Sequence, residues 1–94
     1  MRNKAIADAK RVIQIERKAL SSLERRLNGS FSDAVEIISK CKGRVIVTGI
    51  GKSGIIAQKI VATLNSTGTP SIFLHSADSV HGDLGIIQRG DVVI

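Results

Sequence analysis

A short loop near the middle of the chain combines glycines with groups that bind phosphate: Gly49, Gly51, Lys52, Ser53 and Gly54. Glycines let the backbone come close to a ligand, and the free N–H groups of a helix N-terminus attract anions. A lysine ammonium and a serine hydroxyl add a charge and a donor for phosphate oxygens. The loop therefore predicts a site for a phosphate-bearing ligand, against the alternative of a tight strand-to-helix turn without one.

The same loop matches the dinucleotide fingerprint G-x-G-x-x-G, but the surrounding sequence argues against nucleotide sites. A nicotinamide site expects an acidic residue at the end of the second strand, where this chain has Leu74-His75-Ser76. The phosphate loop of nucleotide hydrolases expects a glycine at the position of Ile46. We therefore expect no nucleotide cofactor.

Both histidines of the chain lie in one stretch with two aspartates: His75, Asp78, His81 and Asp83. This stretch directly follows the second predicted strand, and open α/β sheets bind ligands at the carboxyl ends of their strands. We expect these groups to face the same crevice as the glycine loop. They are candidates for metal ligands, for proton-transfer groups, or for helix caps and turn formers.

The elements that must position these groups alternate between strand and helix. Residues 45–47 form a β-branched apolar run, residues 56–64 repeat apolar side chains at helical spacing, and residues 71–74 form a second run. A third strand is predicted over residues 91–94. This order predicts a doubly wound α/β fold with a parallel sheet, in which residues 43–94 supply the first strand–loop–helix–strand part.

Residues 1–42 are predicted to form helices that precede this part. Apolar residues recur at every seventh position, and the helix that they predict stops at Asn28-Gly29; the repeated residues are Ile6, Ile13, Leu20 and Leu27. This seam either packs on another subunit or lies on its own domain. Ser30 is predicted to cap a second helix that ends at Gly43.

Composition excludes several classes of protein. The net charge is +6, but eight of the fourteen basic residues lie between Arg2 and Arg26, and stacking aromatics are limited to Phe31 and Phe73. We therefore expect no nucleic-acid partner. No apolar stretch is long enough for a membrane span, and Cys41 has no second thiol, so we expect a cytoplasmic protein without membrane partners.

A strand inside a parallel sheet needs partners on both edges, yet the sequence ends within the third strand. We therefore expect an α/β domain truncated after the start of that strand. Such a chain is expected to be inactive alone and to associate with itself.

Taken together, these residues resemble the arabinose-5-phosphate isomerases, whose catalytic part is a sugar-isomerase (SIS) domain. The similarity runs from about Gly43 to Ile94 and extends over the matched positions Gly49, Gly51, Lys52, Ser53, Gly54, Ile56, Lys59, Ala62, Thr63, Ser66, Thr67, Gly68, Thr69, Pro70, Phe73, His75 and the run His81-Gly82-Asp83-Leu84-Gly85. Such a chain of matched spacings is far more specific than the glycine loop alone.

The resemblance implies an aldose–ketose isomerase that interconverts ribulose 5-phosphate and arabinose 5-phosphate, the entry to Kdo synthesis for lipopolysaccharide or capsule. It implies a SIS domain followed by paired CBS domains, in a homotetramer that needs no redox cofactor. Two alternatives remain: an isomerase that acts on a hexulose phosphate, and a non-catalytic SIS module that senses a sugar phosphate.

Residue roles follow from the resemblance position by position. Lys52 and His81 correspond to catalytic positions, and His75 corresponds to a position that can hold zinc. The substrate-binding positions correspond to Ser53, Gly68, Thr69, His75 and His81. The chain departs from the family at Ser76, where proline is usual, and at Asp78, where glutamate is usual. The carbon base is not identified.

Overall fold

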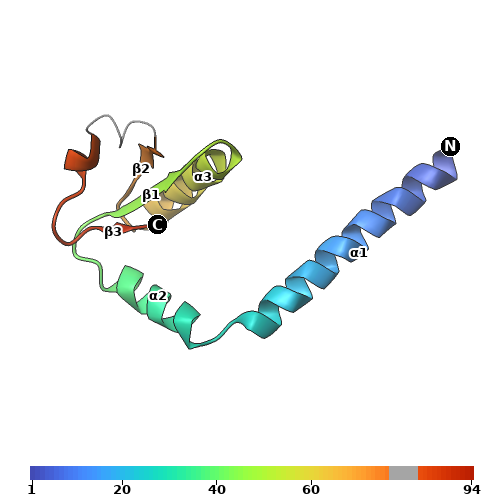
Figure 1. Cartoon of the computed structure of the whole chain (residues 1–94), viewed down its shortest axis with the longest axis horizontal. Coiled ribbons are helices and arrows are strands. Elements are labelled where there is room, and N and C mark those ends of the chain that lie inside the picture. The colour runs from blue at the N-terminus through green and yellow to red at the C-terminus, as the bar shows by residue number, and fades with distance from the viewer. Residues whose placement is uncertain (77–82) are drawn as a thin grey trace. The chain divides into compact units, whose positions relative to one another are not determined.

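The computed structural model describes residues 1–76 and 83–94. The elements, in chain order, are α1 (Arg2–Arg26), α2 (Gly29–Ser39), β1 (Val45–Gly49), α3 (Lys52–Ser66), β2 (Ser71–His75), the 3-10 helix η1 (Asp83–Ile86) and β3 (Val92–Val93) (Figure 1). Contacts divide the chain into two compact units, Met1–Asp33 and Ala34–Ile94. No helix in the described parts is both long and apolar enough to span a bilayer.

The second unit contains a parallel sheet with the strand order β2-β1-β3. β1 is central: its register with β2 runs from Val45 opposite Ser71 to Gly49 opposite His75. The strand–helix–strand alternation and the parallel sheet confirm the predicted α/β fold. Because parallel strands share one direction, the glycine loop and His75 both follow the carboxyl edge of this sheet.

The core lies around β1. Val45 and Ile46 are fully inaccessible to solvent, although side chains alternate between the two faces of a strand, so β1 is buried on both faces as predicted. Val45 and Val47 form a cluster with Ala57 of α3, against which Phe73 of β2 packs. α3 therefore packs against the central strand.

Two helix boundaries differ from the sequence prediction. The side-chain oxygen of Asn28 accepts a hydrogen bond from the backbone N–H of Ser30 at 3.0 Å, so Asn28 caps α2 in place of Ser30. α2 ends at Ser39, not at Gly43. Gly43 instead permits a close approach of two loops, because a Cβ atom there would lie 2.8 Å from the carbonyl carbon of Gly90.

Asp91 joins the loop before β1 to the segment before β3. Its carboxylate accepts the backbone N–H groups of Arg44 and Gln88, both at 2.8 Å, and lies 3.6 Å from the guanidinium Nη2 of Arg44. The same Nη2 donates to the carbonyl of Ile86 at 2.8 Å. The hydrogen bonds from Arg44 and then Gln88 hold the pKa of Asp91 below its ordinary value, although desolvation opposes them.

Replacing Asp91 with asparagine is expected to lower the urea midpoint at pH 7, because an amide nitrogen would face one of the two N–H donors. A lowered folded-state pKa stabilises the protein above the unfolded pKa of about 3.9 and loses that effect as the pH falls through the folded value. The difference between wild type and Asp91→Asn should therefore shrink below pH ~4. A difference that stays constant from pH 7 to pH 3 would contradict this role.

Candidate functional site

The loop between β1 and α3 has a backbone that only glycines adopt easily. Gly51 has φ 58° and ψ −127°, a region that side chains disfavour. A Cβ atom on Gly49 would lie 2.9 Å from the carbonyl carbon of Ser53, so the end of β1 and the first turn of α3 touch through their backbones. Among the described residues, and leaving aside the two chain neighbours of Gly51, no atom lies within 4 Å of a Cβ placed on Gly51, so these residues leave the loop open to a ligand.

Lys52 and Ser53 occupy the first turn of α3 and are exposed. Their backbone N–H groups have no carbonyl partner within the helix, and the helix dipole is positive at this end. Both residues border a groove of about 350 Å³, whose walls are formed by Val47, Thr48, Lys52, Ser53, Ile56, Ala57, Ile60 and Ile94. The arrangement offers an anion site at one end of a largely apolar groove.

Two hydroxyl groups that the sequence analysis did not single out join the strand ends at this edge. The hydroxyl of Thr48 donates to the carbonyl of Leu74, and that of Ser76 donates to the carbonyl of Gly49 at 3.3 Å. In the sequence, the only feature that could have pointed to Thr48 was its position as a hydroxyl residue directly after the apolar run at residues 45–47. These bonds fix the start of the glycine loop relative to the end of β2.

His75 lies opposite Gly49 in the strand register and is exposed. Its ring meets Phe73 edge to face, with centroids 6.1 Å apart and ring planes at 81°. The structure therefore places His75 at the same edge as the glycine loop, as the sequence predicted. Its roles in substrate and zinc binding stay predictions.

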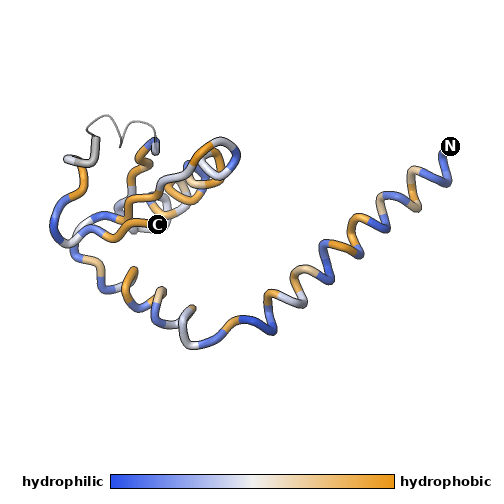
Figure 2. The backbone as a smooth tube through the Cα atoms, viewed as in Figure 1, coloured by the Kyte–Doolittle hydropathy of each residue, from blue (hydrophilic) through white to orange (hydrophobic). Residues whose placement is uncertain are grey.

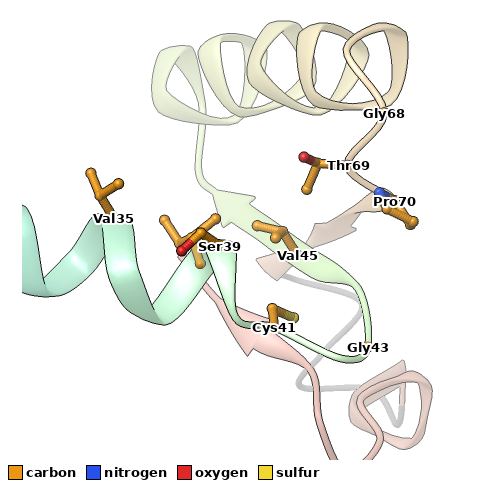
Figure 3. A pocket seen from close by; sticks show the side chains of 9 residues that line it. Val35, Ser39, Cys41, Gly43, Val45, Gly68, Thr69 and Pro70 are labelled. Carbon is orange, nitrogen blue, oxygen red and sulfur yellow. The ribbon is translucent and has the colours of Figure 1, made fainter.

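Gly68 and Thr69 lie at the opposite, amino edge of the sheet. They precede β2 and border a cavity of about 370 Å³ with Cys41 and Val45 (Figure 3). The length of β1, about 13 Å at 3.3 Å per residue, separates this edge from the glycine loop. One copy of the chain thus does not bring Gly68 and Thr69 together with Lys52, and their substrate roles stay predictions.

The turn at Gly68 has a clear structural basis. Gly68 has φ 94°, and the N–H of Thr69 donates to the carbonyl of Leu64 at 2.8 Å, which closes α3. The amide of Asn65 then holds both backbone groups of Ser71, at 2.8 and 3.0 Å. This network sets the starting point of β2.

His81, Asp78 and Gly82 lie outside the described residues, so the catalytic and substrate-binding roles of His81 stay predictions. Within residues 1–76 and 83–94, no group of three histidine, cysteine or acidic side chains could hold a metal ion. Of the candidate metal ligands, His75, the proposed zinc ligand, and Asp83 fall inside the described part of the chain.

Comparison with known proteins assigns the family. The family model described as "SIS domain" matches residues 37–94, which include the whole sheet, α3 and the glycine loop. The chain belongs to the SIS domain family. The family predicted from the matched loops is therefore confirmed.

Curated SIS relatives share about half of their residues with this chain. A protein of Pseudomonas aeruginosa named arabinose 5-phosphate isomerase KdsD is 51% identical over 89 residues, covering 95% of this chain and 27% of that protein. The protein of the same name from Escherichia coli K12 is 49% identical over 85 residues, covering 90% of this chain and 26% of that protein. The chain thus spans about a quarter of the length of these relatives.

Solved SIS structures confirm the fold. An Escherichia coli CFT073 protein, described as in complex with A5P, superposes with a TM-score of 0.88 at 41% identity, covering 97% of this chain and 48% of that one. A Bacteroides fragilis protein, described as a phosphosugar isomerase involved in capsule formation, superposes with a TM-score of 0.83 at 38% identity. The match covers 94% of this chain and 47% of that protein.

Proposed function

We propose that the full-length protein to which this SIS chain belongs interconverts D-arabinose 5-phosphate and D-ribulose 5-phosphate. The observation that carries the proposal is the 51% identity over 89 residues to a protein named arabinose 5-phosphate isomerase. The open glycine loop and the anion-binding end of the groove at Lys52 and Ser53 support a ligand with a phosphate group.

The proposed mechanism has two parts, binding of the phosphate and transfer of a proton. The loop N–H groups and the Ser53 hydroxyl hold the phosphate, which fixes the sugar relative to the edge of the sheet. A proton then moves between neighbouring carbons through an enediol, and Lys52 or His81 stabilises the charge that develops on oxygen. The aldose and the ketose are isomers at the same oxidation level, so the reaction needs no redox cofactor.

Several finer assignments belong to this proposal. His75 contacts the sugar and also takes a zinc ion, whereas sugar contacts from Gly68 and Thr69, which lie at the opposite edge of the sheet, require another copy of the chain. The protein acts in the cytoplasm as a homotetramer, without nucleic-acid or membrane partners, and supplies Kdo synthesis for lipopolysaccharide or capsule. The relatives named arabinose 5-phosphate isomerase and the structural neighbour described as involved in capsule formation support this choice of pathway.

The proposal is tested by assaying the full-length protein with a panel of aldose and ketose phosphates. We expect turnover of arabinose 5-phosphate and ribulose 5-phosphate. Turnover restricted to a hexulose phosphate would reject arabinose 5-phosphate as the substrate and favour the alternative, a hexulose-phosphate isomerase. Binding of sugar phosphates without any turnover would favour the sensor.

The 94-residue chain alone is expected to show no isomerase activity in the same assay. It spans about a quarter of the relatives, and its groove carries one cationic side chain, Lys52, among the described residues. Weak binding of phosphate is still expected, because the loop and the helix N-terminus are present. Full activity of this chain would show that the site has been misplaced.

A further inference from the structure

A serine that the proposed mechanism does not use is bonded to the start of the glycine loop. The half-buried Ser76 donates its hydroxyl to the backbone carbonyl of Gly49 at 3.3 Å, across 27 residues of sequence. Gly49 ends β1 and is the first glycine of the loop. Ser76 therefore holds the residue at which the central strand becomes the loop.

The loop has few bonds of its own that fix its shape. Glycines occupy three of the six positions 49–54, and a glycine adopts positive and negative φ at similar cost. Gly54 and Ile55 donate to the carbonyls of Ile50 and Gly51 through long hydrogen bonds of 3.4 and 3.3 Å. Within the described parts of the chain, the N–H groups of Ile50 and Gly51 donate to no backbone carbonyl or side chain. A restraint from outside the loop therefore has a large influence on its shape.

The bond from Ser76 fixes the direction of one peptide group in this loop. The described peptide bonds are all trans, so the carbonyl of Gly49 and the N–H of Ile50 point in opposite directions. The same carbonyl oxygen lies close to α3, because a Cβ atom on Gly54 would be 3.0 Å from it. By holding the carbonyl of Gly49, Ser76 sets the orientation of the first N–H group of the loop.

Ser76 is attached to a well-packed part of the sheet, as a restraining group must be. The hydrophobic runs of β1 and β2 end just before Thr48 and His75 (Figure 2). Leu74 is buried, and its carbonyl accepts the hydroxyl of Thr48. Gly49 lies opposite His75 in the strand register. The ends of the two strands are thus bonded to each other directly before Ser76.

We propose that Ser76 is a positioning residue, whose hydroxyl holds the N–H groups of the glycine loop in the arrangement that binds the phosphate of the substrate. This role depends on the proposed function only in that the ligand is a phosphate ester, whichever sugar carries it. Ser76 acts through Gly49 and needs no contact with the substrate. Because the phosphate is bound alike in the substrate and in the transition state, loss of the hydroxyl changes KM more than kcat.

Steady-state kinetics of the full-length protein test this role. Ser76→Ala is expected to raise KM for arabinose 5-phosphate about fivefold, the effect of one hydrogen bond. The value of kcat should stay within about twofold of the wild type. Inorganic phosphate, used as a competitive inhibitor, reports on the phosphate site without the sugar, and its Ki should also rise about fivefold. Ser76→Thr keeps a hydroxyl and should restore both KM and Ki.

Ser71 supplies the matched control. Its hydroxyl donates to the carbonyl of Val45 at 2.6 Å, which is the same kind of bond from β2 to β1 at the amino edge of the sheet. Ser71 is buried, so Ser71→Ala should lower Tm, but KM and the Ki of phosphate should keep their wild-type values. A purely structural role of Ser76 predicts instead that both variants lower Tm and that neither changes KM.

Three results would overturn the role of Ser76: unchanged KM and Ki in Ser76→Ala, no restoration by Ser76→Thr, or an equal rise of KM in Ser71→Ala. The proposed function fails separately. If the wild-type protein turns over only a hexulose phosphate, the same variants are compared with that substrate and with inorganic phosphate. If it turns over no sugar phosphate, the Kd of inorganic phosphate from calorimetry takes the place of Ki and should rise by the same factor in Ser76→Ala.

Discussion

Replacing Lys52 with alanine in the full-length protein is expected to lower kcat for ribulose 5-phosphate by about 10² to 10³. Lys52 begins α3 and borders the groove beside Ser53, where negative charge develops on the substrate oxygen in the proposed mechanism. An interaction formed mainly in the transition state lowers kcat more than it raises KM when it is lost. Steady-state kinetics in both directions of the reaction provide the measurement.

Lys59 supplies the matched control. It is an exposed lysine on the same helix, outside the residues that line the groove, so Lys59→Ala should retain wild-type kinetics. If Lys52→Ala keeps the wild-type kcat, Lys52 has no catalytic role. An equal loss in both variants would indicate a general effect of charge on α3.

Replacing Ile46 with alanine is expected to destabilise the protein by about 2–5 kcal/mol. Ile46 is fully inaccessible in the central strand, and its loss leaves a cavity between fixed neighbours. The cost is a large share of the about 5–15 kcal/mol that holds a typical domain together. Urea unfolding followed by circular dichroism measures it.

Ile55 offers the same substitution at an exposed position. It is 66% exposed on α3, so Ile55→Ala should change stability by no more than about 0.5 kcal/mol. Equal losses at the two positions would mean that the sheet is not the stabilising core. A small loss at Ile46 alone would mean that the surrounding side chains collapse into the vacated space.

Much of the fold could be predicted because each strand and helix carries a local pattern. The β-branched run at residues 45–47 indicates burial on both faces, and the helical spacing after Gly54 indicates α3. The N-terminal end of α2 was predicted less well. Asn28 and Ser30 are both good capping residues, and only the backbone path shows which oxygen meets which N–H.

The candidate site was predicted in part. The glycine loop and His75 share an edge because each lies at the carboxyl end of a parallel strand, which is a consequence of chain order. Grouping Gly68 and Thr69 with them rested on the resemblance alone. The five residues of β2 separate Gly68 from the carboxyl edge, so the two positions precede the strand while His75 ends it.

The sequence by itself determined the strand–loop–helix order, the combination of glycines with Lys52 and Ser53 in the loop, and the apolar seam of α1, since each depends on residues close together in the chain. Tertiary structure decided which distant groups meet. Asp91 bonds the backbone of Arg44, and Gly43 makes room for Gly90, across 47 residues in each case. Such contacts arise only once the sheet aligns β3 beside β1, because hydrogen bonds and close approaches depend on positions in space that no local pattern encodes.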